Sequence, residues 1–378
     1  MNLVDPGESD SDHYCFSLRA NPAGDRAARG DVMTKDLKLG WHIGYWGRSM
    51  PAGVPETLQM IEALGYDSVF TAESWGSDAI SPLAWWGAGT SRLRLCTNIV
   101  QISARTPAAT AMAAITMDHL SGGRFCLGLG VSGPQVVEGW YGQRFNKPLA
   151  RTREYVNIIR KILARDERLT NDGPEYPIPA RDGMGLGKAL NVMTHPLRAD
   201  LPIFLGAEGP KNVALAAEIA DGWFPIFYAP RHESMYAAHL AEGFARPTAR
   251  RTPEDFEILA MATTSIDDDM ERAYDRVRPT IALYVGGMGA QEMNFHADVF
   301  RRLGYEAAVD TIQELFLNGK QNEVIAAVPN AMIDEICLVG PPAKIRDDLA
   351  AWRESRVTTL IVGGSPDTLR TMAELVFG

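Results

Sequence analysis

The sequence predicts an α/β fold made of about eight strand–helix units. From Leu37 onward, short β-rich runs alternate with helical patterns, which is the rhythm of a parallel sheet covered by helices. Hydrophobic residues make up 46% of the 378 residues, enough to bury one large core. The number of units alone allows either a closed barrel or an open, doubly wound sheet.

The first 36 residues differ from the rest of the chain. They mix Asp, Ser, Gly, Arg and Pro without apolar periodicity, so we expect a disordered or irregular tail. The run MNLVDPGESDSDHYCF is acidic and polar where a secretory signal would be basic and then apolar. We therefore expect a cytoplasmic protein whose residues 37–378 form one domain.

The first half of that domain contains four predicted strands. They are LKLGWHIGYW, YDSVFTAES, LRLCTNIV and GRFCLGLG. The helices expected after the first three strands run from Pro55 to Leu64 before the C-cap Gly65, from Pro82 to Thr90, and from Pro107 onward through an Ala-rich stretch. A fourth helix is expected over Leu149–Leu163.

Four more units follow, together with two insertions. The predicted strands are LPIFLGAEG, DGWFPIFY, FEILAMATTSI and TTLIVGG, with helices from Pro210 and over Pro342–Trp352. Residues 166–200 are rich in Gly, Pro and charge, and we expect this insertion to cover the barrel mouth. Residues 270–335 are mostly helical, with a break at Gly286, Gly287 and Gly289.

Charge and cysteine usage exclude several classes of partner. The formal net charge is −10, whereas polyanions are bound by clustered Lys and Arg, so we expect no nucleic-acid partner. No apolar run approaches the 18 residues needed to span a bilayer, so we expect no membrane partner either. Cys15, Cys96, Cys126 and Cys337 stand alone, which favours reduced thiols over disulfides or zinc. His119 and His195 lack neighbours at metal-ligand spacing, so we predict structural roles and no metal.

Two glycine turns are candidate ligand sites. Gly128, Gly130 and Gly133 match G-x-G-x-x-G after a strand, but the acidic residue of a dinucleotide fold is missing about 20 positions later. A plain tight turn is the alternative interpretation. In GAEGPKN the helix start would attract a coenzyme phosphate, with Lys211 adding charge. A solvated lysine on an ordinary turn is equally compatible with this pattern.

Several stretches together resemble the luciferase-like superfamily. These are YDSVFTAESW, LRLCTNIVQISARTPAATAMAAITMDHLSGGRFCLGLGVSG and LPIFLGAEGPKNVALAAEIADGWFP, and the likeness covers nearly all of residues 37–378. SGPQVVEGWYGQ and VGPPAKIRDDLAAWRESRVTTLIVGG look most like the mycobacterial-type branch that uses the deazaflavin coenzyme F420. The resemblance implies a closed (β/α)8 TIM barrel of the bacterial luciferase type, with ligand loops at the carboxyl ends of its strands.

The resemblance also implies a coenzyme site. Asn98 and Ile99 match the pair that forms a non-proline cis peptide behind the coenzyme ring in relatives; a regular strand end is the alternative. The turns that hold the coenzyme tail in relatives match two runs here, namely Gly130, Val131, Ser132 and Gly133, and Gly206, Ala207, Glu208, Gly209, Pro210 and Lys211. FMN in place of F420 is the alternative coenzyme.

The resemblance is incomplete at the proton carrier. Related deazaflavin dehydrogenases have an Asp-His pair where this chain has Glu73 and Ser74, so the usual general base is missing. This favours a reductase that gives hydride to a C=C, C=N or C=O group of a small organic substrate. His42 is the first candidate proton carrier, although a lone strand histidine is often a packing residue. Glu73 is the second, either as an acid or as a structural carboxylate beneath the coenzyme.

Two other functions are compatible with the same residues. An FMN-dependent monooxygenase would need a partner reductase and oxygen, and a non-catalytic coenzyme-binding protein would turn nothing over. Relatives are often homodimers through helices beside strands two and three, and the Ala-rich helix from Pro107 is a candidate surface. We expect a substrate pocket walled by aromatic residues, namely Trp46, Trp75, Trp85, Trp86, Trp140 and Tyr141.

Overall fold

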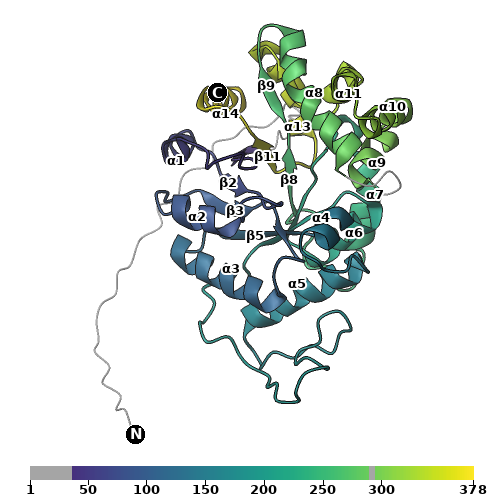
Figure 1. Ribbon diagram of the computed structural model, residues 1–378. Coiled ribbons are helices and arrows are strands. Elements are labelled where there is room, and N and C mark those ends of the chain that lie inside the picture. The colour runs from purple at the N-terminus through teal and green to yellow at the C-terminus, as the bar shows by residue number, and fades with distance from the viewer. Residues whose placement is uncertain (1–35, 289–293) are drawn as a thin grey trace, which may run out of the picture. The chain divides into compact units, whose positions relative to one another are not determined.

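The computed structural model describes residues 36–288 and 294–378, shown in Figure 1. Its main sheet is parallel, in the order β3-β2-β1-β11-β8-β7-β6-β5-β4, and an additional pairing of β3 with β5 closes it. The strands are β1 (Lys38–His42), β2 (Ser68–Thr71), β3 (Arg94–Thr97), β4 (Val100–Gln101), β5 (Phe125–Gly130), β6 (Ile203–Gly206), β7 (Gly222–Phe224), β8 (Glu257–Met261) and β11 (Thr359–Val362). Because β4 continues the third strand after Asn98 and Ile99, the ring has eight positions. The closed barrel is confirmed, and the open sheet and dinucleotide fold are excluded.

Helices alternate with the strands and cover the barrel. They are α1 (Val54–Ala63), α2 (Ile80–Gly87), α3 (Pro107–Ser121), α4 (Pro134–Gly139), α5 (Pro148–Ala164), α6 (Pro210–Ile219), η1 (Pro230–His232), α7 (Ser234–Phe244), α13 (Pro342–Glu354) and α14 (Pro366–Phe377). The Thr106 hydroxyl caps α3 by accepting from the Ala109 N–H, and Pro107 follows at the first helical position. The sequence patterns found the longer helices to within two or three residues at most ends and missed α4, α7 and α14.

The barrel interior is filled by apolar side chains and closed by charge at one end. The interior cluster is Phe70, Cys96, Cys126, Phe204, Phe224, Leu259 and Ile361, with Ile99 packed against it. At the amino ends of the strands, the Arg94 guanidinium pairs with Asp67 at 2.7 Å and Glu257 at 2.9 Å. The interior is therefore a packed core, and a ligand has to bind outside it, at the carboxyl ends of the strands.

The predicted insertion over residues 270–335 forms a helical cap with its own core. It comprises α8 (Met270–Gly287), α9 (Phe295–Arg302), α10 (Glu306–Leu317), α11 (Gln321–Ala326) and α12 (Asn330–Asp334), flanked by the parallel pair β9 (Thr264–Ile266) and β10 (Leu338–Gly340). A second apolar cluster, which includes Ile281, Phe300 and Ile312, holds these helices together. Gly286 and Gly287 form the last turn of α8 against Phe316, while Gly289 lies outside the described residues.

The expectation that residues 166–200 cover the barrel mouth was wrong. The Arg198 guanidinium donates to the Phe125 carbonyl at 2.7 Å, at the amino end of β5. Nearby, His119 Nε2 lies 2.8 Å from the His195 carbonyl oxygen, in a structural contact. The segment follows a barrel helix, and barrel helices run back toward the amino ends of the strands. In Figure 1 it lies beside α3 and α5. Glu175 and Tyr176 contact Lys147 and Arg151 at the start of α5, so the segment runs along the outside of the barrel.

The described residues bear on the other expectations in part. The predicted tail and Cys15 lie outside them, except for Asp36, whereas Cys96, Cys126 and Cys337 are buried and free.

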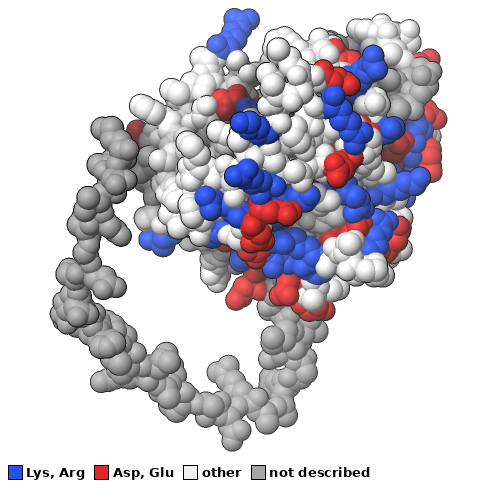
Figure 2. Space-filling view, turned by 90° about the horizontal axis from the view of Figure 1, so that it is seen from below, with Lys and Arg blue, Asp and Glu red and all other residues white. Residues whose placement is uncertain are grey.

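In the described part of the chain, every helix is too short or too polar to cross a membrane. On the face shown in Figure 2, basic and acidic side chains are intermingled over the middle and right of the described surface. Such a mixed face offers a polyanion little electrostatic attraction.

Candidate functional site

The floor of the barrel mouth is formed where the third strand breaks. The peptide bond between Asn98 and Ile99 is cis, as the family resemblance implied, and the Asn98 N–H donates to the Thr71 carbonyl at 2.7 Å. The Ile99 side chain packs on the barrel interior and lies close to Gly130 and Gly206. A Cβ atom at Gly130 would come within 2.6 Å of Ile99 Cδ1, so a larger residue there would displace the Ile99 side chain. The result is an apolar surface at the carboxyl ends of the strands.

The two predicted coenzyme turns lie beside this floor. Val131, Ser132 and Gly133 follow β5, and Ser132 has a positive φ of 60°. The run from Gly206 to Lys211 follows β6 and leads into α6, with Gly209 as N-cap and the Lys211 side chain exposed. The Trp223 indole donates to the Ala207 carbonyl at 2.7 Å and fixes this second turn. The structure thus brings both turns to the mouth; their binding role stays a prediction.

His42 lies at the end of β1, against the backbone of the cis peptide. Its Nδ1 accepts the Gly44 N–H at 3.0 Å, and its ring also hydrogen-bonds to the Asn98 backbone. Burial lowers the pKa of His42 to about 4, against the opposing effect of the Asn98 hydrogen bond. The neutral ring therefore has both nitrogens engaged with the backbone. This arrangement favours a positioning role over the predicted proton carrier.

Glu73, at the end of β2, is held in place by its neighbours. Arg105 Nη1 lies 2.7 and 2.9 Å from its two oxygens, and Oε2 also accepts the Gln101 N–H at 3.0 Å. The side chain of Glu73 is only 5% exposed. Ser74 contributes its carbonyl, which accepts from Gln101 Nε2 at 3.2 Å. The contacts favour the structural carboxylate over the acid that the sequence also allowed.

A second titratable pair at the mouth was missed by sequence reasoning. His296, at the start of α9 in the cap, places Nδ1 2.9 Å from Oε1 and 2.8 Å from Oε2 of Glu208. Burial opposes protonation of this ring, but the charge and hydrogen bond of Glu208 outweigh it, so the pKa of His296 is raised. The two residues are 88 positions apart, and no motif surrounds His296. Only the tertiary structure could have paired them.

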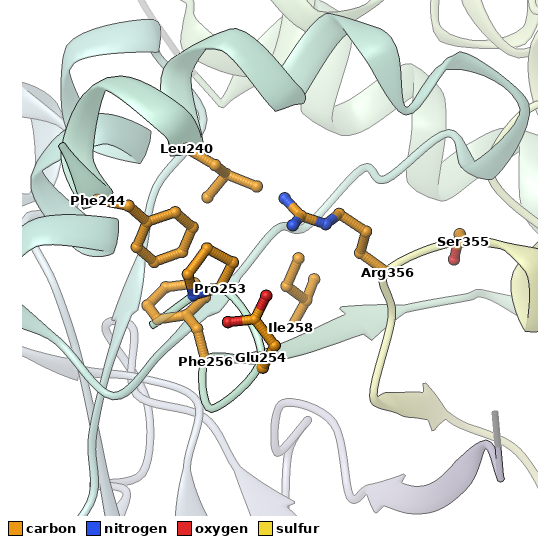
Figure 3. Close-up of a pocket in the computed structure, with 8 residues that line it drawn as sticks. All are labelled: Leu240, Phe244, Pro253, Glu254, Phe256, Ile258, Ser355 and Arg356. Atoms are coloured by element: carbon orange, nitrogen blue, oxygen red, sulfur yellow. The ribbon is translucent and has the colours of Figure 1, made fainter. Parts of the chain in front are cut away.

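Two cavities lie at opposite ends of the barrel. One, of about 230 Å³, is at the mouth and is lined by Glu73, Ser74, Gly76, Ser77, Asp78, Ala104, Arg105, Trp140 and Tyr141. The other, of about 240 Å³, lies between α7 and the residues that precede β8 and β11, where Figure 3 shows Leu240, Phe244 and Arg356. Because this second cavity is at the amino ends of the strands, we assign the ligand site to the mouth.

The predicted aromatic wall is only partly present. Trp140 and Tyr141 line the mouth cavity, and the Tyr141 hydroxyl donates to the Ser74 carbonyl at 3.4 Å. Trp86, on the buried face of α2, packs against Trp46, with ring centroids 5.6 Å apart. Trp85 was predicted wrongly, since it is 80% exposed on the outer face of α2. The position of Trp85 on the helix turns its side chain outward, and the linear sequence pattern did not reveal this orientation.

Known proteins resemble this chain in sequence and in fold. A Mycobacterium tuberculosis protein provisionally named coenzyme F420-dependent oxidoreductase Rv3520c is 56% identical over 91% of this chain and 100% of its own length. The solved coenzyme F420 dependent tetrahydromethanopterin reductase from Methanopyrus kandleri superposes with a TM-score of 0.73 at 22% identity, over 90% of this chain and 97% of its own. The solved structure of an F420-dependent secondary alcohol dehydrogenase with an F420-acetone adduct superposes with a TM-score of 0.69 at 19% identity. The match covers 90% of this chain and 98% of the dehydrogenase. The two structural matches show the fold alone.

Membership of a family is shown by the family model. The model described as luciferase-like monooxygenase matches residues 39–359, which include every barrel strand except the last three residues of β11 and the first of β1. The matched region contains the cis peptide, both turns and the cap. The chain therefore belongs to the luciferase-like monooxygenase family.

Proposed function

We propose that this protein is an F420-dependent oxidoreductase that transfers a hydride between the deazaflavin and a small organic substrate, acting as a reductase. The relative at 56% identity over its full length, whose name specifies F420, is the observation that carries the choice of coenzyme. The coenzyme when bound supplies two-electron hydride chemistry, while the protein supplies binding and orientation.

The residues at the mouth fit a planar, polar-edged ring. Ile99, on its cis peptide, presents an apolar surface above the barrel core, against which one ring face can pack. At its side, Gln101 Nε2 donates to the Glu73 and Ser74 carbonyls, each at 3.2 Å. This fixes the amide and leaves Gln101 Oε1 buried without a partner among the described residues. An N–H donor of a bound ring would satisfy a buried acceptor of this kind.

Other groups of the protein fix the shape of the coenzyme site. Arg105 and the Gln101 N–H hold the Glu73 side chain in one position, so the adjoining backbone carbonyls keep theirs. His42 holds the Asn98 backbone from the other side. The turn from Gly206 to Lys211 opens α6, whose N-terminus attracts an anionic coenzyme tail. All three features pre-organise binding before a substrate arrives.

The groups available for proton transfer support a reductase direction. An alcohol dehydrogenase needs a base at the reacting oxygen, and Ser74 offers none where related enzymes have histidine. A reductase needs an acid that can protonate an electron-rich O, N or C after hydride arrives. We therefore propose substrates that contain a C=O, C=N or C=C group.

Parallel titration of the purified protein with F420 and FMN tests the coenzyme. We expect tryptophan fluorescence to be quenched at much lower F420 than FMN concentration. Trp140 lines the mouth cavity, so Trp140→Phe should reduce the quench. Preference for FMN would contradict the proposal and favour an oxygen-dependent monooxygenase. Tight F420 binding without hydride transfer to any substrate would indicate a coenzyme-binding protein.

A further inference from the structure

The cap contacts loops that follow two opposite strands of the barrel. Tyr45 follows β1 and Glu208 follows β6, and these strands are diametrically opposed: β11, β8 and β7 separate them in one direction, and β2, β3 and β5 in the other. The Tyr284 hydroxyl of α8 hydrogen-bonds to that of Tyr45, and His296 of α9 contacts Glu208. The cap thus reaches both sides of the mouth.

The imidazole of His296 is fixed in this span. Its ring stands edge-on to Tyr284, with centroids 4.9 Å apart, and to Phe227, at 5.9 Å. Asn294, which is 4% exposed, accepts the backbone N–H groups of His296 and Ala297, and its Nδ2 donates to the Tyr284 carbonyl at 3.0 Å. The end of α8 and the start of α9 are therefore joined, and the ring is held in one place above the strands.

The pair of His296 and Glu208 has the arrangement of a proton donor. Glu208 takes Nδ1, and within residues 36–288 and 294–378 the other nitrogen, Nε2, has no hydrogen-bond partner. A carboxylate on one nitrogen fixes the orientation of an imidazole and stabilises its charged form. The His296 side chain is 23% exposed, which leaves solvent access for reprotonation. Tyr284, whose ring is next to His296, hydrogen-bonds to Tyr45, and Arg302 donates to the Glu208 backbone carbonyl at 3.1 Å.

We propose that His296 is the general acid of this enzyme, positioned by Glu208. The inference rests on the proposed function. For a ketone, the bound reduced coenzyme would supply a hydride that forms a C–H bond at the carbonyl carbon, while the C=O π pair moves to oxygen. His296 Nε2–H gives its proton to that oxygen, so the alcohol and oxidised coenzyme form. The neutral imidazole then takes a proton from solvent.

The first test measures the protonation state without turnover. Histidine-labelled protein is titrated by NMR, and the resonance lost in His296→Gln identifies the ring among the seven histidines of the chain. We expect the His296 pKa to lie above the free value of about 6.5 and to fall in Glu208→Gln, which removes the opposing charge. A His296 pKa at or below 6.5 in the unchanged protein would overturn the acid role.

The second test uses reduced F420 with a panel of ketones, enones and imines. His296→Gln keeps an amide that can donate to Glu208, so we expect the F420 Kd to stay within twofold while kcat falls by roughly 100-fold or more. In His296→Ala, added imidazole should restore part of the rate in proportion to its protonated fraction. His232→Gln is the matched control, because His232 Nε2 contacts Glu335 at 3.2 Å in another His–Glu pair; it should keep the wild-type rate.

The outcomes separate the two proposals. Wild-type protein that fails to bind F420, or binds it and reduces nothing, contradicts the proposed function, and the NMR titration still decides the state of His296. Wild-type turnover with an unchanged kcat and pH profile in His296→Gln overturns the general-acid assignment and leaves the proposed function standing.

Discussion

His42 and Glu73 show why residue type alone is a poor guide to a catalytic role. Both are titratable and both lie at the carboxyl ends of strands, yet each is held by several contacts with the protein. His296 lies in a segment without interpretable motifs. Its partner, Glu208, lies in the turn that was predicted to hold the coenzyme tail. Side-chain partners across 88 positions follow from tertiary packing, which no local pattern encodes.

The depressed pKa of His42 makes a prediction about stability. The folded-state pKa is about 4 and the unfolded value about 6.5, so the unfolded chain binds more protons between these values. The stability contributed by the neutral ring is present above pH 6.5 and is lost as the pH falls to about 4, by up to about 3 kcal/mol. Urea unfolding at several pH values should show this loss in the wild type. His42→Gln should lack that component, and identical pH dependence would contradict the shift.

The ion pair of Arg105 and Glu73 makes a second prediction. Arg105→Met leaves a buried carboxylate unpaired and should lower the free energy of unfolding by about 3 kcal/mol. The double variant with Glu73→Gln should lose less than the sum of the two single changes. A double-mutant cycle in urea measures the coupling. Lys320→Met breaks an exposed pair with Glu323 and should change stability by under about 1 kcal/mol; equal losses at both sites would refute the argument.

At the scale of elements, much of the barrel could be predicted because its signals are local. Alternating strand and helix patterns and prolines at helix starts located all eight barrel positions, and the family resemblance decided their closure. Short helices such as α4, with six residues, carry too few positions for a period to be recognised. The placement of residues 166–200 required the direction of the preceding helix, which runs toward the amino ends of the strands.

The contact between β5 and Ile99 gives a prediction at this scale. Gly130→Ala puts a Cβ atom 2.6 Å from Ile99 Cδ1, so the flexible side chain must move while the strands stay paired. We expect the F420 Kd to rise at least tenfold with little change in circular dichroism. Gly89→Ala, whose new Cβ would meet only the Trp86 carbonyl at 3.6 Å, is the control and should bind as the wild type does. Unchanged F420 affinity in Gly130→Ala would mean that Ile99 is not the floor of the site.

At the scale of the whole molecule, the exposed apolar residues on two neighbouring helices favour a homodimer. Trp85 on α2 is 80% exposed, and Met112 and Leu120 on α3 are 59% and 70% exposed. Figure 1 places these helices side by side on the outside of the barrel. Large apolar side chains gathered on one surface are typical of protein contacts, and a twofold dimer uses the same patch on both copies. This supports the expectation that α3 contributes to a dimer.

Substitution at this surface tests the homodimer. We expect the wild-type protein to have the mass of two 41.4 kDa chains by light scattering. Trp85→Asp combined with Met112→Glu should give the mass of one chain, because two charges per copy would be buried without partners across a self-complementary contact. Leu317→Glu, at a residue 62% exposed on α10 in the cap, should stay dimeric. A monomeric wild type would contradict the dimer, whereas a dimer that survives the double change would place the interface elsewhere. F420 binding by the monomeric variant should be unchanged, since the mouth lies at the ends of the strands and not on the outer face of α2 and α3.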